Sequence, residues 1–265
     1  MYRVLMYALV GVSAELAEQL VAVETGGEDA VHQARTRVRR LRSILSVYRK
    51  AFDRDAEGRM RARLKGLGHR LGNVRDLEVR ARDLAELAAD QQNADVAQSV
   101  RHLADRAREQ HERALDDLLR LLRSRGLREL LADLQQFAAA PPLSDAGSAD
   151  PVKVARKGLK KAVRRVQRDE GDALEQRHAV RKTERRIRYA AEAVSDDLGH
   201  RAKRLAAAAE TVQDALGDHR DLVLLGRHLR EAAPDGTLDA VAASCERRAD
   251  DAVAGLDEGL AAIEW

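Results

Sequence analysis

Two sequence motifs occur twice in this chain, in the same order and at nearly the same spacing. Residues 32–42 read HQARTRVRRLR and residues 178–188 read HAVRKTERRIR, an offset of 146 positions. Downstream, LGNVRDL at 71–77 matches LGDHRDL at 216–222, an offset of 145 positions. Motifs that repeat in order at one offset indicate a duplicated structural unit. The chain is therefore predicted to fold as two similar halves related by a pseudo-twofold axis.

A segment rich in helix-breaking residues separates the two halves. Pro141 and Pro142, followed by Ser, Asp and Gly residues, cannot continue a helix. We therefore predict a first helical bundle at residues 1–138, a linker at 139–150 and a second helical bundle at 151–265, which together form one domain.

The composition favours an all-α fold built from long helices. Only 3% of the residues are aromatic and there are four prolines, whereas Ala, Leu and Arg dominate. Short connections between long helices favour antiparallel bundles. Helices are predicted near residues 2–23, 29–51, 55–70, 75–89 and 93–137 (with a break near Gly126), and near 151–168, 172–195, 197–216, 219–232 and 236–262.

Each motif helix carries a row of cations beside its apolar face. At 100° per residue, Val38, Leu41 and Leu45 point to the core, and the row beside them is His32, Arg35, Arg39 and Arg42. The second motif repeats the row as His178, Arg181, Arg185 and Arg188. Guanidiniums stacked on one helix edge repel one another, and an elongated polyanion relieves that repulsion at each turn. Arginine suits phosphate because its planar fork donates to two oxygens.

The helix predicted over 151–168 adds a third basic row. Its members are Lys153, Lys157, Lys160 and Arg164. The corresponding part of the first half is not basic, so this row belongs to the second half alone. It is either a solvated face or one wall of a basic groove.

The LGxxRD motif is interpreted first as a tight turn between two helices. Gly72 and Gly217 are suited to end one helix, and Asn73 and Asp218 to cap the next. In this interpretation the arginine that follows, Arg75 or Arg220, is an additional candidate for ligand contact.

Bulk properties give weaker constraints. The formal charge is only +3, but acids are absent from several basic stretches, so the local field exceeds what the net charge indicates. The single cysteine, Cys245, excludes an internal disulfide and fits a reducing compartment. The apolar stretch Val4–Val12 is too short to span a bilayer. A cytoplasmic protein without membrane association is expected.

The motif H-x-x-R-x-x-x-R-R-L/I-R, present twice and each time followed by L-G-x-x-R-D, resembles the CHAD family, named for a conserved histidine in an α-helical domain. The resemblance covers essentially the whole chain. It implies two four-helix bundles around a basic surface, binding of inorganic polyphosphate without catalysis or a cofactor, and in some members localisation to polyphosphate granules. Carried over by position, it marks as polyphosphate-binding His32, Arg35, Arg39, Arg40, Arg42, Lys153, Lys157, Lys160, Arg164, His178, Arg181, Lys182, Arg185, Arg186, Arg188 and Tyr189.

The chain departs from a symmetrical pattern in two places. Ser43 stands where the second half has Tyr189, so any role of the tyrosine is not duplicated. Glu184 stands where the first half has Val38, which would place a carboxylate near the second basic row. No E-x-E-x-K motif of a fused triphosphate-tunnel enzyme occurs in the chain. The resemblance therefore implies the binding module alone.

Two other ligand classes remain open at this point. Asp29 precedes His32 by three residues, and Glu175 precedes His178 by the same spacing, which di-iron bundles use for metal ligands. Neighbouring arginines oppose a bound cation. Nucleic acid is the second alternative, because basic helices attract any phosphate polymer. However, the rows contain few side chains that recognise or stack on bases, so nucleic acid is expected only as a weaker competitor.

Overall fold

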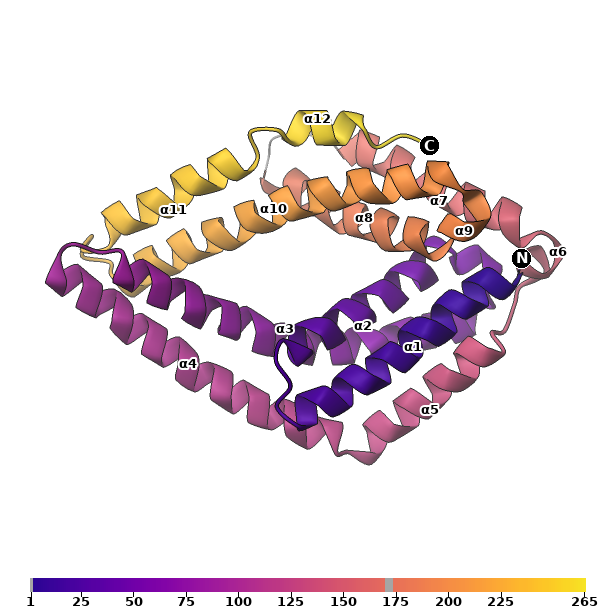
Figure 1. The fold of residues 1–265 in the computed structure, drawn as a ribbon, viewed down its shortest axis with the longest axis horizontal. Helices are drawn as coiled ribbons and strands as arrows, with labels where there is room; N and C mark the ends of the chain where they lie inside the picture. The colour runs from indigo at the N-terminus through magenta and orange to yellow at the C-terminus, as the bar shows by residue number, and fades with distance from the viewer. Residues whose placement is uncertain (1, 170–173) are drawn as a thin grey trace.

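A computed structural model describes residues 2–169 and 174–265 and shows an all-α protein, as predicted (Figure 1). The first half contains α1 (Tyr2–Glu24), α2 (Ala30–Val47), the 3-10 turn η1 (Arg49–Ala51), α3 (Arg54–Ala89), α4 (Ala94–Leu122) and α5 (Arg125–Ala139). The remainder contains α6 (Asp145–Ala149), α7 (Pro151–Asp169), α8 (Leu174–Ala193), α9 (Ser195–Leu198), α10 (His200–Ala232), α11 (Asp239–Ala252) and α12 (Leu256–Ala261). Helices α2, α3 and α4 correspond in order to α8, α10 and α11. The duplication itself stays a prediction.

The LGxxRD motifs do not form turns, so that interpretation was wrong. α3 and α10 run without a break through Gly72 and Gly217. In α3 the buried apolar row continues through the motif at spacings of three and four residues, as Met60, Leu64, Leu67, Leu71 and Val74. A glycine inside a helix costs about 1 kcal/mol, which is less than the burial and hydrogen bonds that a break would remove. The predicted break near Gly126 is found at Ser124, which caps α5 by accepting a hydrogen bond from Leu127 N at 3.2 Å.

One continuous hydrophobic core contains side chains from both halves. It joins the inner faces of α1, α2, α3 and α5 to those of α7, α8 and α10. Tyr48, which is 1% exposed, donates its hydroxyl proton to the Ala190 carbonyl at 2.5 Å. α2 and α8, the two motif helices, therefore lie against each other and are held in register.

The segment that follows α5 packs onto the first half of the chain. Asp53 N donates to the Pro142 carbonyl at 2.8 Å, and Ser144 Oγ donates to the Lys50 carbonyl at 2.6 Å. Gly147 lies so close to Ala51 that an added Cβ would come within 2.0 Å of the Ala51 carbonyl oxygen. α6 and α7 are thereby fixed beside the C-terminal end of α2.

A second, smaller core joins the two halves at the other end of the molecule. The C-terminal half of α3 and the first half of α4 contribute Leu84, Leu87 and Val100. α10 and α11 contribute Leu225, Leu229 and Cys245, together with Leu238 just before α11. In Figure 1 this region is the tip at the left, where α3 and α4 meet α10 and α11. The two cores hold α3 and α10 at both ends and leave polar side chains between them.

α1 is the one helix of the described residues that is long and apolar enough, by length and composition, to cross a membrane. The window Leu5–Glu24 has a mean hydropathy of 1.4 and is longer than the apolar stretch recognised in the sequence. One face of this helix is buried in the main core through Leu9, Val12, Leu16 and Leu20. Packing accounts for the apolar residues of this face, whereas Tyr7, Val10 and Val21 of the same helix are exposed.

Candidate anion-binding site

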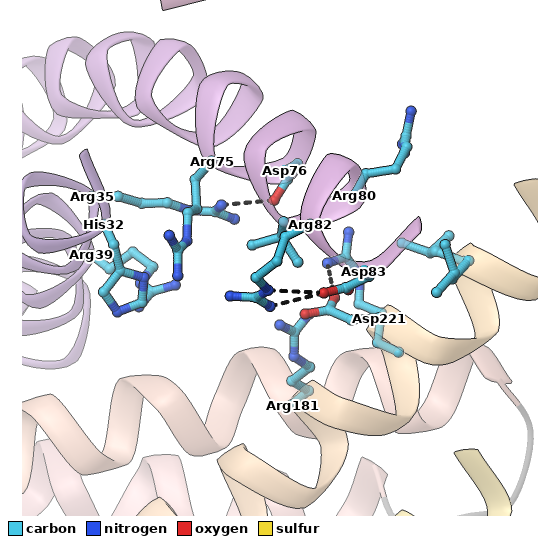
Figure 2. Close-up of a pocket in the computed structure, with 14 residues that line it drawn as sticks. His32, Arg35, Arg39, Arg75, Asp76, Arg80, Arg82, Asp83, Arg181 and Asp221 are labelled. Atoms are coloured by element: carbon cyan, nitrogen blue, oxygen red, sulfur yellow. Dashed lines mark hydrogen bonds and ion pairs between the residues drawn. The ribbon is translucent and has the colours of Figure 1, made fainter. Parts of the chain in front are cut away.

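A pocket of about 350 Å³ lies where α2, α3, α8 and α10 come together (Figure 2). Seven arginines and three aspartates line it, so its charge is strongly positive. α2 supplies His32, Arg35 and Arg39, and α8 supplies Arg181. The long helices α3 and α10 contribute Arg75, Asp76, Arg80, Arg82 and Asp83, and Arg220 and Asp221. The structure therefore brings residues of both motif pairs, 32–42 with 178–188 and 71–77 with 216–222, into one site.

One group of arginines in the pocket is held by carboxylates. Arg35 Nη1 lies 2.7 Å from Asp76 Oδ1 and also donates to the Gly72 carbonyl at 3.4 Å. Arg75 Nη1 lies 3.3 Å from Asp29 and 3.0 Å from Glu78. A Cβ added at Gly72 would lie 3.7 Å from the Arg35 guanidinium carbon, an ordinary van der Waals contact, so Arg35 lies directly over this glycine. The LGxxRD motif of α3 thus positions arginines in the pocket.

On the α10 and α3 walls, the same pairing recurs. Arg220 lies 3.3 Å from Asp221, and Arg82 lies 2.9 Å from Asp83, as Figure 2 shows for the latter pair. Paired guanidiniums at partly exposed positions are fixed in orientation, at little net gain or loss of stability. They define the rim of the site.

A second group of arginines, which consists of two that line the pocket and Arg185 beside them, has no such neutralisation. Among the described residues, no ion pair joins a carboxylate to Arg39, Arg181 or Arg185. The Nε atoms of Arg39 and Arg181 are buried and have no hydrogen-bond partner in this part of the chain. Burial, followed by the nearby Arg39 and Arg181, lowers the pKa of Arg185 to about 9. Burial also lowers the pKa values of Arg39 and Arg181.

These three arginines are therefore crowded, partly desolvated positive charges. Such charges are unfavourable in the absence of a counter-charge, and an anion bound among them removes the repulsion and restores their hydrogen bonds. These unneutralised arginines therefore favour the binding of an anion.

His32 lies at the edge of this cationic group. Burial and then Arg75 lower its pKa, against the opposing effect of Asp29. The imidazole is therefore neutral in the empty pocket at neutral pH. A bound polyanion would reverse the balance and favour the protonated form.

Four other predicted arginines lie in two groups on either side of the pocket arginines. Arg42 and Arg186 are near each other, with Arg61 of α3 also close to both. Arg40 and Arg188 are both ion-paired to Glu192, at 3.4 and 3.1 Å. Arg188 also lies over the Tyr189 ring, with its guanidinium carbon 5.5 Å from the ring centroid.

The remaining predicted residues are distributed more widely. Tyr189 and Ser43 are both buried at 4% exposure, so neither offers a surface to a ligand. Glu184 is fully buried, at 0% exposure. Lys182 is exposed, and the side chain of His178 lies outside the described residues. The α7 row is exposed and does not enter the pocket; Lys157, Lys160 and Arg164, with Lys161 and Arg168, line a separate open hollow of about 600 Å³.

The sequence motifs missed part of the α3 wall. Arg82 and Asp83 line the pocket although neither belongs to a repeated motif. Arg82 follows Arg75 by seven residues, which is two helical turns, so both lie on one face of α3. The helix predicted at 75–89 contained both residues, but only residues of the repeated motifs and of the basic row at 153–164 were taken as candidates for ligand contact.

The metal alternative receives no support from the side-chain positions. In the described portion of the chain, no group of three or more His, Cys, Asp or Glu side chains is arranged to hold a metal ion. Asp29 is ion-paired to Arg75 instead. The side chains of Glu175 and His178 lie outside the described residues.

Comparison with known proteins assigns the family. Residues 12–230 match the model of the CHAD domain, and the chain belongs to this family. Two curated relatives from Mycobacterium tuberculosis strains, both named as uncharacterized proteins, are 30% identical over 237 residues, which is 83% of this chain. The chain spans 44% of the length of these relatives.

Two solved structures share the fold. PptA from Streptomyces chartreusis superimposes with a TM-score of 0.79 at 19% identity, covering 98% of both chains. The CHAD domain from the plant Ricinus communis has a TM-score of 0.72 at 21% identity, covering 100% of this chain and 92% of the other. CHAD domains are generally non-catalytic binding domains, and some members of the family bind polyphosphate.

Proposed function

We propose that this protein binds inorganic polyphosphate, without catalysing a reaction on it, in the pocket between α2, α3, α8 and α10. The observation that carries the proposal is the convergence of Arg39, Arg181 and Arg185, which are crowded and carry no described ion pair. The membership of the chain in the CHAD family supports the same ligand.

The spacing of the cations suits a linear phosphate polymer better than a single small anion. Arg35 and Arg42 are seven residues apart on α2, a rise of about 10 Å along one helix edge. Several consecutive phosphates can therefore be bound at once. The guanidinium fork donates two hydrogen bonds to each phosphate, and His32 adds a donor that gains charge when the ligand is present.

Nucleic acid fits this site less well. Recognition of single strands generally uses aromatic side chains on which bases stack. Tyr189 is the aromatic residue next to the arginines, and its ring is buried. A nucleic acid would therefore bind through its backbone alone and more weakly.

The test is calorimetric titration with long-chain polyphosphate at about 150 mM salt, where weak surface attraction is screened. Single-stranded RNA and DNA are the parallel ligands, and the chain length of the recovered polyphosphate is checked on a gel. We expect tight polyphosphate binding, much weaker nucleic-acid binding and unshortened chains. Equal binding of all three polymers that collapses with salt would reduce the site to a generic basic surface, and shortened chains would contradict a purely binding role.

We also propose that polyphosphate binding directs this protein to polyphosphate granules in the cytoplasm. The support is the family assignment and the proposed ligand. Fluorescence microscopy of the tagged protein in cells with and without polyphosphate synthesis tests it, and an unchanged diffuse signal in both would contradict it.

A further inference from the structure

Two groups of charges flank the pocket arginines, and they differ in net charge. The open flank consists of Arg42, Arg61, Arg165 and Arg186. The closed flank consists of Arg40, Arg188, Glu192 and Glu210. The repeat pairs Arg42 with Arg188 and Arg40 with Arg186, so equivalent sequence positions meet different surroundings in the two flanks.

The open flank holds an excess of positive charge. Burial and then Arg186 lower the pKa of Arg42, and burial and then Arg165 lower that of Arg186. Arg61 contributes to both effects and is itself ion-paired to Glu57 at 2.6 Å. In the described residues, neither Arg42 nor Arg186 forms an ion pair, and the Nε atom of Arg42 is buried without a hydrogen-bond partner. Arg42 and Arg186 are thus two positive charges that no described ion pair neutralises.

The closed flank is neutral. Glu192 accepts from Arg188 Nε at 3.1 Å and lies 3.4 Å from Arg40, and Glu210 lies 2.6 Å from Arg188 Nη2. These carboxylates raise the pKa of Arg188, although burial alone would lower it. Two arginines are balanced by two carboxylates, although the Nε atom of Arg40, like that of Arg42, is buried without a described hydrogen-bond partner. The flanks therefore differ in their carboxylates, and a phosphate chain would meet acidic oxygens here rather than an excess of positive charge.

α7 continues the positive surface beyond the open flank. Gly158 fixes this helix against the end of α2, because an added Cβ would lie 2.8 Å from the Val47 carbonyl oxygen. Arg165 lies close enough to Arg186 to lower its pKa. The exposed side chains that line the adjacent hollow are all cationic: Lys157, Lys160, Lys161, Arg164 and Arg168. The pocket, the open flank and α7 therefore form a continuous run of cations.

We propose that a long phosphate polymer leaves the pocket past Arg42 and Arg186 and continues along α7, and that Glu192 and Glu210 block the opposite exit. This inference rests on the proposed function. It assigns α7 a role in length selectivity, since a chain short enough to fit the pocket does not reach α7. Affinity should therefore increase with polymer length through α7 contacts.

The experiment compares tripolyphosphate with long-chain polyphosphate in the intact protein at about 150 mM salt. For Arg42→Gln with Arg186→Gln, we expect long-chain affinity to fall about tenfold or more, and tripolyphosphate affinity to change less than about twofold. Arg40→Gln with Arg188→Gln removes the same charge from the closed flank and should lower long-chain affinity by a smaller factor than the open-flank variant does. Melting curves of both variants verify the fold.

A second variant keeps the test decisive if a buried substitution disturbs folding. Lys157→Gln with Lys160→Gln alters only exposed side chains and should weaken long-chain binding severalfold. The matched control is Arg108→Gln with Arg113→Gln, which removes two exposed charges on α4 that line neither the pocket nor the α7 hollow. It should change long-chain affinity little.

The possible failures are distinguishable. Wild-type protein that binds neither ligand would overturn the proposed function, and this inference with it. If the wild-type protein binds but the two flank variants lose long-chain affinity equally, the proposed function stands and the one-sided path is overturned. The same conclusion follows if the α7 and α4 variants change long-chain affinity equally.

Discussion

Arg185 offers the sharpest test of the idea that the empty site is electrostatically unfavourable. Its pKa is lowered to about 9 by burial and by neighbouring arginines. At pH 7 the side chain is charged in both the folded and the unfolded protein, but the folded state holds the proton less tightly. The charge therefore destabilises the fold at pH 7, and this penalty declines as the pH rises above about 9. Removing the charge should stabilise the protein.

The size of the effect follows from the pKa. At about 1.4 kcal/mol per pKa unit, the lowering corresponds to at most about 5 kcal/mol. Arg185 is only partly buried, so solvent screening reduces the expected value to about 1–3 kcal/mol. The change Arg185→Met keeps a long apolar side chain and removes the guanidinium, so lost packing does not mask the gain. The free energy of unfolding should rise by this amount.

Binding should change in the opposite direction. A hydrogen bond to a charged partner contributes about 1.5–3 kcal/mol. Loss of the guanidinium should therefore weaken polyphosphate binding by about 10- to 150-fold. Urea denaturation at pH 7 measures the first effect and calorimetric titration the second. Arg108→Met, at an exposed position on α4, is the matched control and should alter neither quantity appreciably.

The joint outcome separates a binding role from a structural one. A variant that is more stable and binds more weakly supports an arginine held in place for the ligand. Lower stability with unchanged affinity would refute this reasoning, because Arg185 would then be part of the structural framework. Double substitution of Arg39 and Arg185 by alanine should abolish most binding while the helical circular-dichroism signal remains.

Two further changes test other parts of the argument. His32 should take up a proton when polyphosphate binds, because the lowered pKa of the empty site rises beside the polyanion, so affinity should increase as pH falls from about 7.5 to 6. Calorimetry in buffers of different ionisation enthalpy measures this uptake, and a His32→Gln variant with undiminished uptake would contradict the assignment. Gly147→Ala should lower the free energy of unfolding by about 1–3 kcal/mol, because its Cβ would lie 2.0 Å from the Ala51 carbonyl oxygen, whereas Gly58→Ala meets open space in α3 and should raise it by up to about 1 kcal/mol. Equal denaturation midpoints for the two glycine variants would contradict the packing described for α6.

The sequence was sufficient to predict the all-α fold and the central arginines. Helical periodicity separates a buried face from its edge, so the sequence alone predicts Arg35, Arg39 and Arg181 beside the core. The structure places these three in one pocket. Periodicity is reliable here because the apolar residues that define it are buried in the core, which allows only one orientation of each helix.

The continuity of α3 and α10 was not predictable from the local motif. Gly followed by Asn or Asp has the composition of a helix end, and the deciding interactions lie elsewhere in the chain. In α3 these are the buried row that ends at Val74 and the guanidinium of Arg35, which comes from 37 residues earlier. Tertiary contacts of this kind override local preference. Arg82 and Asp83 were missed for a different reason, because they lie outside the repeated motifs.

The difference between the two flanks has the same physical origin. A repeat assigns equal roles to Arg42 and Arg188, because it compares positions and not neighbours. Glu192 and Glu210 neutralise Arg188, whereas the neighbours of Arg42 are Arg186 and Arg61. Whether an arginine is available to a phosphate depends on which carboxylates reach it after folding, since each guanidinium has a fixed number of donors to share. Two halves that share one motif can therefore contribute unequally to one site. The carboxylates, more than the arginines, determine the path that a bound polyphosphate can follow.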